Sequence, residues 1–190
     1  MADGSAAPKR KPLKLDLDRI TEKNIGQLKK LNTATFPVVY HDPFYETVLK
    51  NLKTSDYCRL GYYSDVLVSA ICCRLEPRLQ GGQALYMMTL SVLKPYQRRS
   101  LASQLVQWAI DHAQSKEHEE DDVRVMYLHV QTSNEAAITF YKSFGFEVTQ
   151  TIEGYYRNID PADCHVLCKP LNGHPLEAMP SATTENMGEA

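Results

Sequence analysis

The sequence predicts an α/β protein with a mixed central sheet of about seven strands, flanked by about four helices. Three observations favour this class. Strand-like runs follow one another closely between residues 57 and 93, which is typical of antiparallel pairing. A helical segment then separates the runs at 84–93 and 123–131, and a crossover of this kind makes the two strands parallel. The run at 123–131, VRVMYLHVQ, is densely apolar, as expected of a strand buried on both faces.

Two helices are expected before the first of these strands. Thr21 is the predicted cap of the first helix, on which Ile25, Leu28 and Leu31 recur at helical spacing. The non-helical stretch FPVVYHDP follows, over residues 36–43. A short second helix is marked by four apolar residues, Phe44, Val48, Leu49 and Leu52.

Three strands come next, at residues 57–63, 66–76 and 84–93. The turn Ser64-Asp65 separates the first two, and the break PRLQGG separates the second from the third. The helix that follows the third strand carries four apolar residues on one face, Leu101, Leu105, Trp108 and Ala109.

The last third of the chain alternates between loops, strands and one helix. A solvated acidic loop, KEHEEDD at residues 116–122, is expected before the strand at 123–131. The segment SNEAAITFYKSFG predicts a helix that Ser133 or Asn134 caps and Gly145 ends. Two further strands, FEVTQTI and CHVLCKPL, flank the loop EGYYRNIDPAD.

Composition indicates one ordinary globular domain. The chain has 190 residues, of which 43% are apolar and 23% charged. We expect this domain to span residues 13–171, between disordered tails at 1–12 and 172–190. The net charge of −2 argues against broad nucleic-acid binding.

No apolar run approaches the roughly 18 to 20 residues of a membrane helix, and the polar start lacks a signal peptide's apolar core. The expected location is therefore the cytoplasm, with the nucleus as a second compartment.

The five cysteines predict reduced thiols in the core. Their number is odd, and Cys72 and Cys73 are adjacent inside an apolar run. The segment CHVLC suggests zinc, but strand alternation places Cys164 and Cys168 on one face and His165 on the other. No metal is therefore expected.

Residues 96–106, YQRRSLASQLV, place positive charge and small residues at the start of a helix. A helix start presents unpaired N–H groups, and small residues let an anion approach them closely. Arg98 and Arg99 add charged donors at the rim. The segment is a phosphate site in outline, and the alternative is a helix start with solvated arginines. Neither a Walker A motif nor a dinucleotide-binding glycine motif is present.

The order of LYMMTLSVL, QRRSLA, a helix, YLHVQ and NEAAITFYKSFGF resembles the GCN5-related N-acetyltransferase (GNAT) superfamily. In that superfamily, a Q/R-x-x-G-x-G/A turn cradles the pyrophosphate of acetyl-CoA, and here Gln97, Ser100 and Ala102 occupy its three defining positions. FPVVYHDPFY, LHVQTSNEAAI and YYRNIDPADCHVL resemble one branch more closely, the NatE-type (San) N-terminal acetyltransferases. The resemblance covers residues 13–171 and implies a GNAT fold with splayed central parallel strands.

Ser100 departs from the family pattern, which usually has glycine there. A side chain can crowd the pyrophosphate or oppose a positive φ. If Ser100 is helical, its hydroxyl is tolerated or donates to a phosphate; if not, affinity for acetyl-CoA falls.

The resemblance implies roles for residues at the cofactor site. Tyr86 and His129, on neighbouring central strands, would hold a water that takes the proton of the amine, and Tyr141 would protonate or hydrogen-bond the departing thiolate. The alternative for each is an ordinary core residue. A β-bulge near Leu90 to Val92 would offer backbone N–H groups to the thioester oxygen. The remaining residues expected at acetyl-CoA are Gln97, Arg98, Arg99, Ser100, Leu101, Ala102, Ser103 and Asn134.

Peptide recognition is assigned to two loops and one strand residue. The residues expected there are Phe36, Pro37, Val38, Tyr40, Met88, Tyr155, Tyr156 and Ile159. By resemblance, the peptide begins with Met followed by a bulky apolar residue.

Three functions remain open on these grounds. The resemblance implies an acetyl-CoA-dependent acetyltransferase for the α-amino groups of nascent chains, associated with the NatA auxiliary and catalytic subunits and, through them, the ribosome. The alternative is a catalytically weak or inactive subunit docked on NatA. Acetylation of lysine side chains would require deprotonation of an amine with a pKa of about 10.4, and the tyrosine loop disfavours that access.

Overall fold

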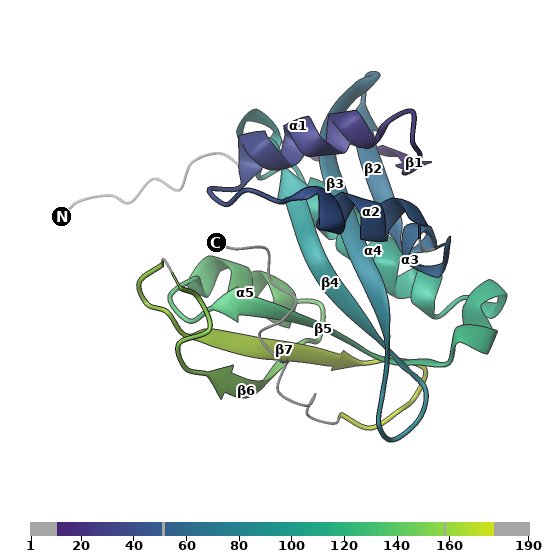
Figure 1. Cartoon of the computed structure of the whole chain (residues 1–190), viewed down its shortest axis with the longest axis vertical. Coiled ribbons are helices and arrows are strands. Elements are labelled where there is room, and N and C mark those ends of the chain that lie inside the picture. Colours follow the sequence, from purple (N-terminus) through teal and green to yellow (C-terminus); the bar gives the residue numbers. More distant parts are fainter. Residues whose placement is uncertain (1–10, 51, 158, 177–190) are drawn as a thin grey trace.

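The computed structural model describes residues 11–50, 52–157 and 159–176, which contain a seven-stranded sheet of order β1-β2-β3-β4-β5-β7-β6 (Figure 1). Neighbouring strands are antiparallel except β4 and β5, which are parallel. The expected mixed sheet is confirmed. The strands are β1 (Asp16–Arg19), β2 (Cys58–Tyr63), β3 (Val66–Pro77), β4 (Gln83–Val92), β5 (Val123–Gln131), β6 (Glu147–Ile152) and β7 (Cys164–Pro170).

Helices cover both faces of the sheet. The α-helices in the described part are α1 (Ile25–Thr35), α2 (Asp42–Lys50), α3 (Leu52–Asp56), α4 (Leu101–Ala113) and α5 (Glu135–Lys142); two 3₁₀ helices are η1 (Lys94–Tyr96) and η2 (Lys116–Asp121). In β3, alternation sends Ala70 into a core cluster with Leu28 and Val48 of α1 and α2. The next residue, Ile71, packs in a second cluster with Leu105 of α4. The sheet is thus buried between the α1–α2 layer and α4.

The two central strands separate after a short paired stretch. Parallel pairing of β4 with β5 runs from Gln83 and Val123 to Tyr86 and Tyr127, and beyond that point the strands diverge (Figure 1). In β4, Met88 is an additional residue, because Cys72 pairs with Thr89 whereas Cys73 pairs with Met87. A bulge bends its strand and increases its local twist. The sequence expectation of a bulge near Leu90 to Val92 is therefore wrong: it lies at Met88.

Several local expectations also differ from the structure. The N-cap residue of α1 is Asn24, not Thr21, and the Thr21 N–H donates to Asn24 Oδ1 at 2.7 Å. The second predicted helix divides into α2 and α3, and α2 begins at Asp42 because Pro43 fits a first helical turn. The edge strand β1, sequence DLDR, is mostly exposed and has no apolar alternation that could reveal it.

Other local expectations are confirmed. The Asn134 Oδ1 accepts from the Ala137 N–H at 3.1 Å and caps α5, and Gly145 has a φ of 82° after that helix. All five cysteines are buried free thiols.

Both predicted tails lie mainly outside the described residues, which omit 1–10 and 177–190. The Asn172 amide donates to the Val123 carbonyl at 2.9 Å and to the Ala113 carbonyl at 3.4 Å. These bonds tie the chain to β5 and α4 past residue 171, so the folded part extends beyond the expected boundary. No helix in the described part is long and apolar enough to cross a membrane.

Candidate active site

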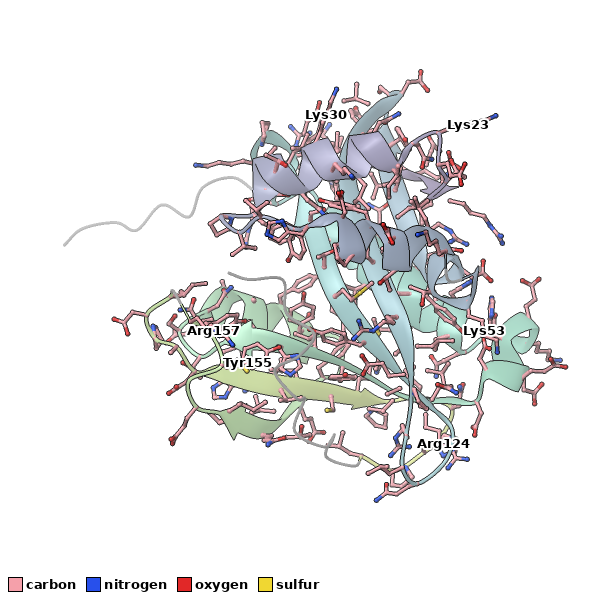
Figure 2. All side chains as sticks on the ribbon, in the orientation of Figure 1. Lys23, Lys30, Lys53, Arg124, Tyr155 and Arg157 are labelled. Carbon is pink, nitrogen blue, oxygen red and sulfur yellow. The ribbon has the colours of Figure 1, made fainter. Side chains whose placement is uncertain are left out.

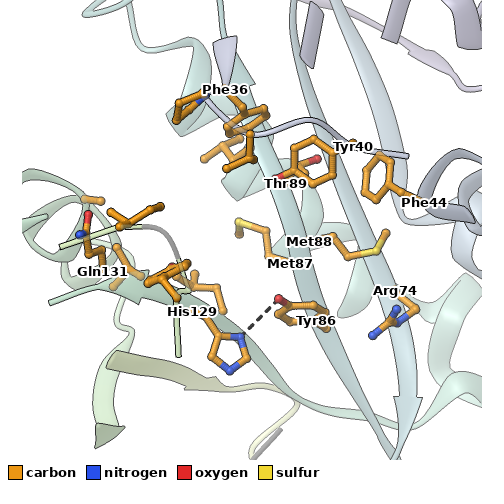
Figure 3. A pocket seen from close by; sticks show the side chains of 18 of the residues that line it. Phe36, Tyr40, Phe44, Arg74, Tyr86, Met87, Met88, Thr89, His129 and Gln131 are labelled. Atoms are coloured by element: carbon orange, nitrogen blue, oxygen red, sulfur yellow. Dashed lines mark hydrogen bonds between the residues drawn. The ribbon is translucent and has the colours of Figure 1, made fainter. Parts of the chain in front are cut away.

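A cavity of about 730 Å³ opens where β4 and β5 diverge (Figure 3). Its walls come from residues 36–41 and the adjoining part of α2, from β3, β4 and β5, from α5 and from the loop residues Tyr156 and Ile159. The structure brings together here twelve of the residues that the sequence singles out: Phe36, Pro37, Val38, Tyr40, Tyr86, Met88, Leu90, His129, Asn134, Tyr141, Tyr156 and Ile159.

Tyr86 and His129 face each other across the gap. The Tyr86 hydroxyl lies 3.3 Å from His129 Nδ1 (Figure 3). Burial lowers the pKa of His129 to about 4, so the imidazole is neutral at pH 7. Burial also raises the pKa of Tyr86, which keeps its phenol protonated. The pair combines a neutral ring nitrogen and a hydroxyl, which can take a proton from a ligand directly or through one water.

Tyr155 lies behind His129. The two rings stack with centroids 4.6 Å apart and planes 16° from parallel, and a hydrogen bond joins the side chains of Tyr155 and Tyr86. Tyr155 is 7% exposed and does not line the cavity. The expectation that it closes over a peptide is therefore wrong: it fixes the orientation of the Tyr86–His129 pair, while Tyr156 lines the cavity.

A charged pair that sequence reasoning missed lies beside Tyr86. The Arg74 guanidinium is 5.5 Å from the centre of the Tyr86 ring, and Arg74 Nε donates to Glu76 at 3.0 Å. Glu76 also accepts from the Tyr127 hydroxyl, and the Tyr127 ring stacks on Tyr86 at 4.8 Å. The signal available in the sequence is the pair of charges at the end of an apolar run, CCRLE.

The described residues of the loop at 153–163, which leave out 158, are held by hydrogen bonds to Gln131 and Thr132 at the end of β5 and by a bond within the loop. The Gln131 amide donates to the Pro161 carbonyl at 2.8 Å, and the Thr132 N–H donates to Asp163 O at 3.0 Å. Within the loop, the Tyr156 N–H donates to the Ala162 carbonyl at 2.8 Å. These bonds place Tyr156 and Ile159 opposite the aromatic segment before α2.

Phe36 and Tyr40 of that segment form a continuous apolar wall with Phe44 in the first turn of α2. Phe36 meets Tyr40 edge to face at 5.4 Å, and Tyr40 contacts Phe44 at 4.8 Å. The sequence did not single out the other lining residues, which alternation alone cannot assign to a cavity: Val39, His41, Pro43, Phe44, Thr47, Arg74, Met87, Thr89, Leu128, Val130, Gln131 and Ala137. Thr89 Oγ1 is buried and has no hydrogen-bond partner in the described structure, so it is available to a ligand.

Tyr141 lies both in the core and at the cavity, the two alternatives that the sequence left open for it. It is 9% exposed and packs in the core around α4, and its side chain also lines the cavity. Its hydroxyl donates to Met87 Sδ at 3.6 Å, which is a weak partner. Burial raises the pKa of Tyr141 and keeps a proton available on the α5 wall.

The arginine-containing turn lies past the end of β4, and none of its residues is among the described cavity lining. The first hydrogen bond of α4 joins the Gln104 N–H to the Ser100 carbonyl, so three N–H groups precede the helical ladder: those of Leu101, Ala102 and Ser103. The Leu101 side chain is 1% exposed and belongs to the core, which leaves only its backbone for a ligand. Gln97 Nε2 donates to the Val92 carbonyl at 3.1 Å and closes the turn. The three N–H groups at the start of α4 therefore have a geometry that can bind an anion.

Ser100 adopts the left-handed conformation, with φ 62° and ψ 15°, and Arg98 also has a φ of 62°. Of the two alternatives for Ser100, the structure thus excludes the helical one. A residue other than glycine is strained in this region. The backbone therefore has the conformation that the family's glycine favours, at the expense of stability.

Ser100→Gly is expected to raise the free energy of unfolding by about 1 kcal/mol, because glycine removes the strain at positive φ. Urea denaturation measures the change. Ser103→Gly, in the first turn of α4, is the matched control and should lower stability by about 0.5 kcal/mol. If both variants lose stability, Ser100 is not strained.

Known proteins share this architecture. The family model described as acetyltransferase (GNAT) family matches residues 25–146. "Probable N-acetyltransferase san" of Drosophila melanogaster is 42% identical over 157 residues, which cover 83% of this chain and 81% of the fly protein. "N-alpha-acetyltransferase 50" of Danio rerio is 42% identical over 158 residues, covering 83% of this chain and 89% of the fish protein.

A solved structure agrees with these relatives. Arabidopsis thaliana Naa50, in complex with the bisubstrate analogue CoA-Ac-MVNAL, aligns with a TM-score of 0.72 and 44% identity, covering 82% of this chain and 97% of the plant chain.

Proposed function

The chain belongs to the acetyltransferase (GNAT) family and is an acetyl-CoA-dependent N-terminal acetyltransferase, and we propose that its substrates are nascent chains that begin with Met followed by a hydrophobic residue. The observation that carries this proposal is the Tyr86–His129 pair in the cavity between β4 and β5, opposite an apolar wall. The peptide in the bisubstrate analogue bound to the plant protein, MVNAL, supports the same class of substrate.

Acetyl-CoA supplies an activated acetyl thioester, and the described residues suit its binding. The three leading N–H groups of α4 and the charges of Arg98 and Arg99 would hold the pyrophosphate. Asn134, Leu90 and Tyr141 line the cavity on the path that the pantetheine arm would take. The unpaired Thr89 hydroxyl offers one further polar contact in the same wall.

His129 and Tyr86 would remove the proton of the substrate amine. An α-ammonium group has a pKa of about 8 and must lose a proton before it attacks a carbonyl. Because His129 is neutral at pH 7, its ring can accept a hydrogen bond from the amine or a bridging water and relay the proton to solvent, and the Tyr86 hydroxyl positions the same group. Tyr155 stacks on His129 and keeps the ring in this orientation.

Tyr141 would serve the other end of the reaction. Its phenol stays protonated because of burial, and its hydroxyl has only a sulfur partner. It can therefore donate a hydrogen bond or a proton to the thiolate as the carbon–sulfur bond breaks.

Phe36→Ala is expected to raise KM for a Met-Leu peptide by about 10-fold while KM for acetyl-CoA stays unchanged, because the variant removes apolar area worth about 1.5 kcal/mol from the peptide wall. Initial rates of CoA release measure both constants. Leu79→Ala is the control, because Leu79 is 94% exposed and does not line the cavity. An equal rise in both KM values would contradict a role in peptide binding.

The decisive assay of the proposal compares peptides that start with Met-Leu, Ser-Leu and N-acetylated Met-Leu. We expect CoA release with the first, little with the second and none with the third. Calorimetric titration with acetyl-CoA is run in parallel. Binding without turnover, or no binding at millimolar acetyl-CoA, would favour the alternative of a weak or inactive subunit.

We also propose that the protein associates with the NatA auxiliary and catalytic subunits and acts beside the ribosome, in the cytoplasm or nucleus. The support is the NatE-type resemblance of residues 13–171. Co-purification with the NatA auxiliary subunit, and ribosome sedimentation with and without it, test this association.

A further inference from the structure

The end of α3 meets the last turn of α4 and the η2 helix that follows it, on the outer side of α4, and none of the three is among the described lining of the catalytic cavity. Asp56 ends α3, His112 lies in the last turn of α4, and His118 lies in η2. One ligand atom of each residue lies within 4.8 Å of the other two. The segment at 116–122, expected to be a solvated loop, instead carries His118 and Asp121 into this cluster, with side chains only 11% and 13% exposed.

His118 is held between two carboxylates. Its Nδ1 lies 3.3 Å from Asp121 Oδ2, and its Nε2 lies 3.5 Å from Asp56 Oδ2. The Tyr57 hydroxyl donates to Asp121 Oδ2 at 2.9 Å, and Lys53, labelled in Figure 2, donates to Asp121 Oδ1 at 2.9 Å. Asp121 is thus fixed behind the imidazole and directs His118 Nε2 toward Asp56.

His112 has a buried nitrogen without a partner. Its ring stacks on Trp108 at 4.8 Å and lies 4.1 Å from the His118 ring, centroid to centroid. Its Nε2 has no solvent contact and no hydrogen-bond partner in the described structure. A buried nitrogen of this kind is costly unless something binds it.

We propose that Asp56, His112 and His118 form a binding site for a divalent transition metal of the Zn²⁺ class. Two imidazole nitrogens and one carboxylate oxygen are a zinc ligand set, and water completes a tetrahedron. Bonds of about 2.1 Å place tetrahedral ligands about 3.4 Å apart, so these side chains would close by about 1 Å around the ion. Asp121 supports the site, because a carboxylate on the far nitrogen fixes the tautomer of a metal-binding histidine.

The charges around Asp56 leave one of its oxygens for the metal. Arg19 lies 3.0 Å from Asp56 Oδ1 and Arg59 lies 3.8 Å from it, whereas Oδ2 faces His118. A shallow pocket lined by Gln104, Gln107, Trp108, Asp111 and His112 reaches the cluster from the surface. A bound ion would join α3, α4 and η2. The expectation of no metal rests on residues 164–168, and no sequence spacing relates Asp56 to the two histidines.

The competing arrangement is a His118 that stays between the two carboxylates through its ring nitrogens without a metal. Titration of the full chain with Co²⁺, after treatment with a chelator, separates the two. We expect binding of one ion, with the visible absorption of a tetrahedral N/O site, no thiolate charge-transfer band, displacement by Zn²⁺, and proton release.

Matched variants assign the ligands. His118→Gln should lower Co²⁺ affinity by roughly 100-fold and Asp121→Asn by roughly 10-fold. His165→Gln is the control, because His165 lies on β7 and hydrogen-bonds Thr151. Zn²⁺ should also raise the thermal midpoint of the wild type and not that of His118→Gln. Acetyl transfer, which uses none of these residues, reports whether each variant is folded.

Three results would overturn the proposal: no tetrahedral Co²⁺ spectrum for the wild type, a thiolate band that assigns the metal to cysteine, or equal affinity in His118→Gln and the wild type. The first two need no variant, so a poorly folded variant does not leave the question open.

Discussion

His129→Ala lowers kcat for a Met-Leu peptide by about 100- to 1,000-fold, as expected when a positioned proton acceptor is removed. His129 Nδ1 lies 3.3 Å from the Tyr86 hydroxyl at the wall of the described cavity. Affinity for acetyl-CoA should stay within about twofold, because the anion turn lies at the other end of β4. Steady-state kinetics with calorimetry of acetyl-CoA measure both quantities.

The control for this variant is His165→Ala, which removes an imidazole from the adjacent strand β7 outside the cavity. It should keep kcat within about twofold of the wild type. If His129→Ala retains more than a tenth of the wild-type kcat at equal folded fraction, His129 is not the proton acceptor.

Acidification destabilises the fold through the same residue. The pKa of His129 is about 4 in the folded state and about 6.5 when unfolded, so between these values the unfolded chain binds more protons. Its contribution is fully present above pH 6.5 and is lost as pH falls toward 4. The expected loss in the free energy of unfolding is about 3 kcal/mol, which urea denaturation from pH 7.5 to pH 4 measures. Burial also lowers the pKa of His112, so His112 adds to the loss in the free energy of unfolding as the pH falls.

His129→Gln separates the contribution of His129 to the pH dependence of stability from that of His112. The glutamine cannot be protonated, so the pH dependence should flatten by about 3 kcal/mol, and only the share from His112 and the carboxylates should remain. His165→Gln should leave the wild-type slope in place. Identical slopes in His129→Gln and the wild type would mean that His129 is not buried in its neutral form.

Long apolar patterns made most of the fold predictable. β5 has the bounds expected from the run VRVMYLHVQ, and Asn134 caps α5 as expected, because a buried strand and a capped helix each have a strong local signature. β1 has no such local signature, because its four residues are mostly exposed and the strand is defined by its pairing with β2. The bulge at Met88 depends on pairing with β3, which composition does not encode.

The site was predictable where a residue type and a strand position coincide. The family resemblance implied the pair of Tyr86 and His129, and the two meet because they lie on the neighbouring parallel strands β4 and β5. Tyr155 was misplaced because two adjacent tyrosines in a loop give no signal of which one turns inward. Arg74 and Glu76 were missed because their role depends on contacts with Tyr86 and Tyr127 across the sheet.

The last hydrogen-bonded position of the β4–β5 ladder is Tyr86 with Tyr127, one residue pair before the strands open. Tyr86 and His129, the groups proposed to handle the proton, therefore lie at the closed end of the gap between β4 and β5, where the ladder sets the backbone spacing, whereas the wall proposed to bind the peptide lies at the open end. Residues in the loops at the open end can be exchanged to accommodate different N-terminal side chains, and Tyr86 and His129 keep their positions. Chemistry and selectivity can thus change independently in this architecture.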